Sequence, residues 1–189
     1  MQLRNSPSRY GVVSIVLHWG VALAVFGLFG LGLWMVGLDY YSAWYRTAPH
    51  WHKGLGVLLF AVLLARLAWR LGGTPPEPVE GSSVATRRLA ALAHGGLYLL
   101  LLAVPLSGYL ISTANGRPVE VFGWFSVPAV LSGLPDQADL AGLAHRYLAW
   151  GLVLLAGLHA AAALKHHVID RDPTLVRMLG RSSRNPQKG

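Results

Sequence analysis

Residues 142–165 read GLAHRYLAWGLVLLAGLHAAAALK, an apolar stretch long enough to cross a lipid bilayer as a helix. It contains two histidines, His145 and His159, at positions 14 residues apart. At about 100° per residue, both return to nearly the same helix face, about 21 Å apart along the axis. An ionisable side chain inside a membrane is costly and is usually functional. The stretch therefore predicts a membrane helix that carries functional imidazoles at two depths.

Three other apolar stretches have the same character, and the whole chain is 53% hydrophobic and only 13% charged. Because hydrocarbon offers no hydrogen-bond partners to the backbone, each stretch should be helical. We expect an all-α membrane protein whose residues 8–179 form a four-transmembrane-helix bundle. The expected helices span about residues 11–38, 52–71, 89–112 and 142–167. Between the third and fourth helices, residues 119–131 should lie flat on the surface as a cap, and the basic tail 180–189 should be disordered.

The basic residues lie mostly on one side of this bundle. Twelve of the sixteen fall in the N-terminal segment, the middle connection and the C-terminal tail, which share one side. The positive-inside rule therefore places both termini in the cytoplasm. The net charge of +8 thus follows from membrane topology, and we expect no nucleic-acid partner.

The other three stretches also carry histidines, namely His18, His52 and His94. The chain has no cysteine, which excludes thioether-linked haem and thiolate-bound iron–sulfur clusters. Paired histidines at two depths instead favour two b haems, each bound by two imidazoles. His52 matches the depth of His145, and Gly54 and Gly56 after it should leave space for a flat ring. His159 has two candidate partners, His18 and His94, and depth alone does not choose between them.

Several short motifs resemble the bacterial cytochrome b561 family. They are LHW (17–19), WHKGLG (51–56), AVPLSG (103–108), LHAAAALKHH (158–167) and DPTLVRM (172–178), and the resemblance covers about residues 8–179. It implies a multi-pass protein of the bacterial inner membrane with two b haems. It also implies that His18 and His159 ligate an inner haem, and that His52 and His145 ligate an outer one.

The resemblance further implies electron transfer between a periplasmic donor and ubiquinone, with superoxide oxidation as the leading activity. Four basic residues of the outer connections, Arg46, Lys53, Arg117 and Arg146, would attract an anionic donor such as superoxide. We expect possible haem contacts from Lys53, Arg66 and His94. His166, one heptad beyond His159, is a candidate to contact the quinone or to supply its proton.

Two other functions compete with this interpretation. The chain could be the haem-bearing membrane anchor of a hydrogenase- or dehydrogenase-type complex, although its connections are short. It could also be a transporter, but transporters usually carry acidic groups at mid-membrane and internal repeats, and neither is evident here. We rank the transporter last.

Overall fold

The computed structural model describes residues 2–79 and 81–180. Within them, four long helices are α1 (Val12–Met35), α2 (Thr47–Leu71), α3 (Val84–Thr113) and α4 (Gln137–Val168). All four are long and apolar enough to cross a membrane. The expected four-helix membrane bundle is therefore confirmed, and the chain is a multi-pass membrane protein.

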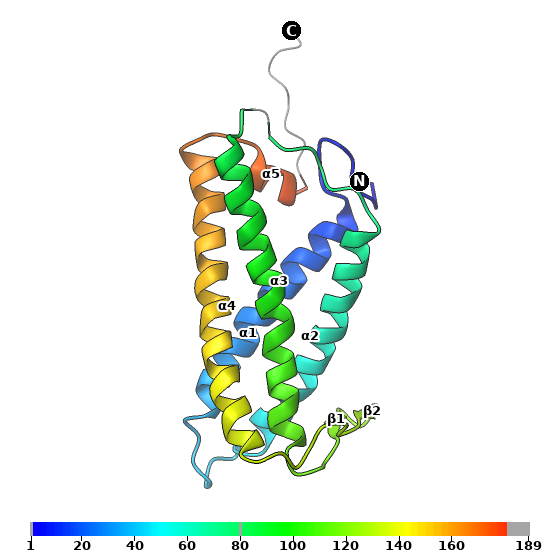
Figure 1. Ribbon diagram of the computed structural model, residues 1–189, viewed down its shortest axis with the longest axis vertical. Coiled ribbons are helices and arrows are strands. Elements are labelled where there is room, and N and C mark those ends of the chain that lie inside the picture. The colour runs from blue at the N-terminus through cyan, green and yellow to red at the C-terminus, as the bar shows by residue number, and fades with distance from the viewer. Residues whose placement is uncertain (1, 80, 181–189) are drawn as a thin grey trace.

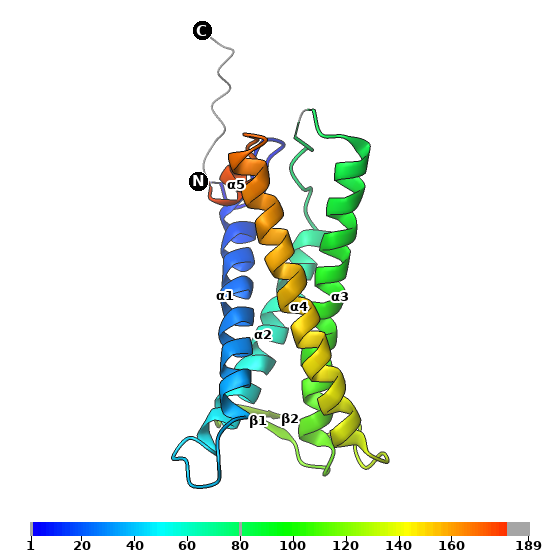
Figure 2. The ribbon, with the colours of Figure 1, turned by 90° about the vertical axis from the view of Figure 1, so that its left-hand side faces the viewer.

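The bundle has two distinct ends (Figures 1 and 2). At the terminal end, α1 begins, α4 ends and the short helix α5 (Thr174–Met178) packs across the bundle. At the opposite end, which we call the hairpin end, the chain forms strands β1 (Val119–Val121) and β2 (Phe125–Val127). Helices α3 and α4 pack closely together, as do α1 and α2.

Three helices begin about five residues earlier than the apolar pattern predicts, at Thr47, Val84 and Gln137. The prediction followed apolar residues, whereas backbone hydrogen bonding continues through polar residues at helix ends. In α3, for example, the hydroxyl of Ser83 caps the helix by accepting a hydrogen bond from the Thr86 amide at 3.1 Å. As a consequence, His52 and His145 lie inside their helices and not at their first residues.

A buried apolar cluster lies at the middle of the bundle. Val21, Val25 and Leu152 are buried there, and Leu152 is seven residues from both His145 and His159. Leucines that point outward stay exposed, as Leu23 and Leu154 do, as expected for side chains that face lipid. An apolar core therefore separates two levels of histidines.

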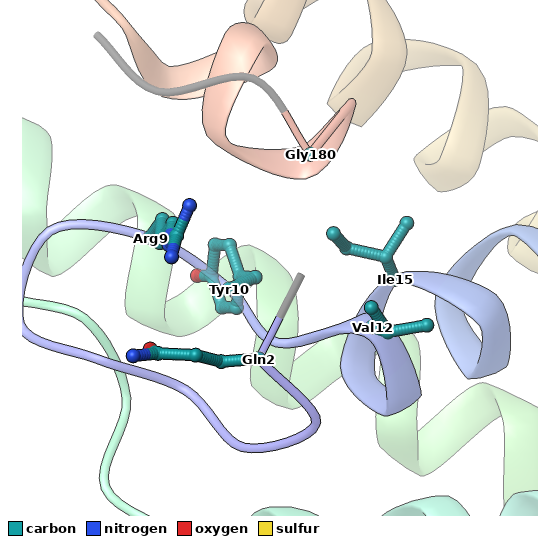
Figure 3. Close-up of a pocket in the computed structure, with 6 residues that line it drawn as sticks. All are labelled: Gln2, Arg9, Tyr10, Val12, Ile15 and Gly180. Carbon is teal, nitrogen blue, oxygen red and sulfur yellow. The ribbon is translucent and has the colours of Figure 1, made fainter.

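The terminal end is closed by hydrogen bonds between segments far apart in the sequence. Trp19 Nε1 donates to the Met178 carbonyl at 3.1 Å, and Arg177 Nη1 donates to the Glu77 carbonyl at 2.8 Å. The Glu77 amide in turn donates to the Pro7 carbonyl at 2.9 Å. A cavity between the N-terminal segment and Gly180 has a volume of about 10 Å³ (Figure 3), so it holds one water molecule at most.

Among the described residues, the hairpin and the short helix α5 are regular elements that the sequence did not predict. Residues 119–131 were expected to lie flat as a cap. The structure instead pairs β1 and β2 antiparallel, with Val121 opposite Phe125. Val121 is fully buried, and the Tyr109 hydroxyl anchors the chain after β2 by donating to the Pro128 carbonyl at 2.7 Å. Of the tail predicted to be disordered, all but Gly180 lies outside the described residues.

Candidate functional site: two histidine pairs across the bundle

At the hairpin end, His52 of α2 faces His145 of α4, with ring centres 6.1 Å apart and ring planes at 79°. Toward the terminal end, His18 of α1 faces His159 of α4, with ring centres 6.3 Å apart and planes at 67°. We call these the outer pair and the inner pair. The structure therefore brings together, one pair at each level, the four histidines that the family resemblance implies as haem ligands.

The ring spacing tests whether a metal ion fits between the members of each pair. Two metal–nitrogen bonds of about 2 Å, with each ring centre about 1 Å behind its nitrogen, place the ring centres about 6 Å apart. Both pairs have this spacing. His94 lies closer to His159, at 5.2 Å and in edge contact. The inner level thus has the spacing of an ion-bridged pair at His18, while His94 is packed against a member of that pair.

Glycines allow the outer imidazoles to approach neighbouring helices. A Cβ atom on Gly32 would lie 3.2 Å from Cε1 of His52, and one on Gly108 would lie 3.1 Å from Cε1 of His145. A Cβ on Gly56, one helical turn after His52, would meet nothing within 4 Å. Open space at Gly56 agrees with the expected room for a flat ring. Gly54 does not provide such room, because the ring of Phe122 fills it.

The orientation of His145 is set by hydrogen bonds from α3. Its Nδ1 lies 2.9 Å from the Val104 carbonyl and 3.2 Å from the Ser107 hydroxyl. Since a carbonyl only accepts, the His145 proton belongs on Nδ1, which leaves Nε2 free to bind a metal. Sequence reasoning singled out His145 but missed Val104, Ser107 and Gly108 as its supports. The only signal for them was the AVPLSG motif.

Two arginines lie beside the inner pair. Arg66 Nη2 donates to His18 Nδ1 at 3.0 Å, and the guanidinium groups of Arg66 and Arg70 lie 5.7 and 5.2 Å from the ring centre of Tyr98. Neither arginine forms an ion pair with a carboxylate of residues 2–79 or 81–180. Arg66 is half-buried and Arg70 is exposed in the last turn of α2, so two positive charges without a carboxylate partner among the described residues make this end of α2 suited to an anionic group.

The other predicted site residues are more peripheral. Lys53 is exposed, as are Arg46, Arg117 and Arg146. His166 lies at the terminal end, where its Nδ1 is 2.9 Å from a carboxylate oxygen of Asp170 and 2.9 Å from one of Asp172. The sequence placed His166 on the histidine stripe but did not reveal these two acidic partners.

Asp172 links His166 to α5. Its carboxylate accepts a hydrogen bond from the Thr174 amide at 2.8 Å, at the start of that helix. Burial by itself would raise the pKa of Asp172, but hydrogen bonds from Thr174 and the adjacent His166 ring together lower that pKa below its ordinary value. The carboxylate therefore remains ionised in neutral solution and holds α5 against the end of α4.

Comparisons with known proteins agree with the four-helix membrane fold. The sequence model of prokaryotic cytochrome b561 matches residues 9–181. The chain is 53% identical to "Cytochrome b561 homolog 2" of Escherichia coli K12 over 183 residues, covering 97% of each protein. It is 30% identical to "Probable superoxide oxidase CybB" of Yersinia pestis over 172 residues, covering 90% of this chain and 96% of that one. It is also 28% identical to "Cytochrome b561 homolog 1" of E. coli K12, with 92% and 98% coverage.

Proposed function

Because the chain belongs to the prokaryotic cytochrome b561 family, a family of haem b electron-transfer proteins of membranes, we propose that it is a superoxide:ubiquinone oxidoreductase with two haems. The observation that carries this proposal is the pair of facing imidazoles at each of two levels, 6.1 and 6.3 Å between ring centres. The 30% identity to a protein named as a probable superoxide oxidase supports the choice of substrate.

In this proposal His52 and His145 hold the outer haem, and His18 and His159 hold the inner one. Haem iron supplies reversible one-electron chemistry when it is bound. The apolar core of Val21, Val25 and Leu152 between the two levels excludes water and ions from the path of the electron. The terminal end faces the cytoplasm of a bacterial inner membrane, as the distribution of basic residues predicts.

Arg66 and Arg70 bear on how His18 would hold the inner haem. When Arg66 donates to Nδ1 of His18, the proton of that imidazole must sit on Nε2. For Nε2 of His18 to hold a haem iron, the ring proton would have to move to Nδ1, and Arg66 would no longer donate to that atom. A haem propionate is the carboxylate that Arg66 would then pair with, and Arg70 beside Tyr98 is placed to assist. His94 contributes packing against His159 and no ligand bond.

Each end of the bundle carries side chains suited to one of the two proposed substrates. Arg46, Lys53, Arg117 and Arg146 are all exposed and belong to the hairpin end, where a positive field would raise the encounter rate with the superoxide anion. At the terminal end, His166 lies between two carboxylates in contact with solvent. An imidazole so placed can take protons from the cytoplasm and pass them to reduced ubiquinone.

Haem counting on the detergent-purified protein tests the proposal. We expect two low-spin b haems per chain by the pyridine haemochrome assay, and one in His145→Ala. Superoxide generated enzymatically should then reduce ubiquinone in the presence of the wild-type protein and not with His145→Ala. Wild-type protein without haem would refute the proposal. Two haems with no superoxide-dependent quinol, together with co-purification of a stoichiometric soluble subunit, would favour the membrane-anchor function.

A further inference from the structure

The turn between β1 and β2 has an aromatic residue where asparagine or glycine is usual. Phe122 and Gly123 both have positive φ, at 52° and 74°, and the Trp124 amide donates to the Val121 carbonyl at 2.9 Å. These values define a type I′ turn, whose first central position favours Asn, Asp or Gly. A side chain with a β-carbon in this left-handed region costs roughly 1–2 kcal/mol. Something in the structure must offset that cost.

The ring of Phe122 packs directly on the backbone of α2. A Cβ atom on Gly54 would lie 2.7 Å from Cζ of this ring, so no larger residue fits beneath it. The ring centre also lies 5.0 Å from that of Trp51 and 5.6 Å from that of His50. We call the contact between Phe122 and Gly54 the wedge. Its burial is the favourable interaction that keeps Phe122 in a strained conformation.

The wedge presses on the side of α2 that faces away from the outer histidine pair. Gly54 follows His52 by two residues, which is about 200° around the helix. His52 itself points toward α1, where its Cε1 lies 3.2 Å from the position of a Cβ on Gly32. Phe122 therefore does not cover His52. It lies behind α2 and limits how far that helix can move away from α1.

His52 has fewer hydrogen bonds to orient it than its partner His145 has. Nδ1 of His145 is bound by Val104 and Ser107. In contrast, Nδ1 of His52 is buried without a hydrogen-bond partner among the described residues. The backbone of Leu28 in α1 lies near the His52 ring. The position of His52 is thus set by the position of α2.

We propose that Phe122 is a positioning residue for the outer haem, holding α2 against α1 so that His52 stands opposite His145. The proposal rests on the haem assignment above and adds a function for the hairpin. A ligand constellation has to be held to within about 0.5 Å by its surroundings. The wedge supplies this restraint at the level of the helix, because Nδ1 of the imidazole has no hydrogen-bond partner among the described residues.

Phe122→Asn distinguishes the effect of the aromatic ring from that of the turn, because it removes the ring and keeps a residue that suits the turn. Asparagine suits the first position of a type I′ turn, so the hairpin should persist while the wedge is lost. We expect the ferric low-spin electron paramagnetic resonance signal of one haem to change, because that signal depends on the angle between the two imidazole planes. We also expect one of the two haems to transfer severalfold faster to excess apomyoglobin. Val130→Asn, at an exposed position after β2, should behave as wild type.

Gly54→Ala tests the same contact from the other side. Its Cβ would displace the Phe122 ring and should change the same haem signal. Gly27→Ala is the matched control, since that exposed glycine has open space at its Cβ position and lies opposite His18 on α1. If wild type holds two haems and both wedge variants match their controls, the positioning function is refuted while the haem assignment stands. A wild-type protein without haem refutes both.

Discussion

Gly108→Ala provides a quantitative test of how the outer pair is supported. The new Cβ would lie 3.1 Å from Cε1 and 3.3 Å from Nδ1 of His145, closer than the 3.5–4.0 Å of an ordinary carbon contact. The His145 ring must then shift by about 0.5 Å, which is the tolerance of a preorganised site. Its 2.9 Å hydrogen bond to Val104 would lengthen to about 3.4 Å, beyond the usual range for N–H···O bonds.

Loss of that hydrogen bond should cost about 1 kcal/mol, which corresponds to about fivefold weaker retention of one haem. The assay is the rate of haem transfer from the purified protein to apomyoglobin, with the haem count measured alongside. Gly95→Ala is the matched control, because Gly95 lies on the same helix with open space at its Cβ position. Both variants gain the same helix propensity from alanine. Equal transfer rates in the two variants would refute the proposed support of His145 by α3.

Three further predictions concern the inner level and the terminal end. Arg66→Met removes a positive charge beside His18 and should lower the midpoint potential of one haem in a redox titration; an unchanged potential would argue against the proposed propionate contact. His94→Leu should retain two haems per chain by pyridine haemochrome, and a count of one would mean that His94 is a ligand. Because the pKa of Asp172 is lowered in the folded state, its contribution to stability is complete above about pH 4 and is lost as the pH falls through the lowered pKa. Asp172→Asn should therefore remove part of the acid dependence of thermal unfolding below pH 4, and identical pH profiles for the two proteins would contradict this.

The pairing of the histidines shows which features could be predicted from the sequence and which could not. Membrane spans follow from composition, because hydrocarbon forces any long apolar segment to bond its own backbone. The same regularity places His145 and His159 on one face of α4. Depth in the membrane, however, does not distinguish His18 from His94 as the partner of His159, because the two lie at similar depths. Rotation and tilt of α1 and α3 produce the distances of 6.3 and 5.2 Å to His159.

Short segments outside the membrane helices were the least predictable. The hairpin end contains β1, β2 and the Phe122 turn, where the residue preference of a type I′ turn argues against phenylalanine. Its conformation depends on a contact with Gly54, nearly 70 residues earlier in the chain. The early starts of α2, α3 and α4 were missed for a related reason, since caps and interface residues carry no apolar pattern.

Apolar length, the absence of cysteine and the periodic histidines of α4 were thus sufficient to predict a four-helix membrane protein with paired imidazoles, since each depends on local chemistry or on helical periodicity alone. Tertiary structure decided which histidine has the spacing of an ion-bridged partner for His159 and which side of His145 is hydrogen-bonded. It also decided that Gly54 receives an aromatic ring from the hairpin instead of leaving space for a cofactor. These features depend on distances between helices, and packing between side chains far apart in sequence sets those distances.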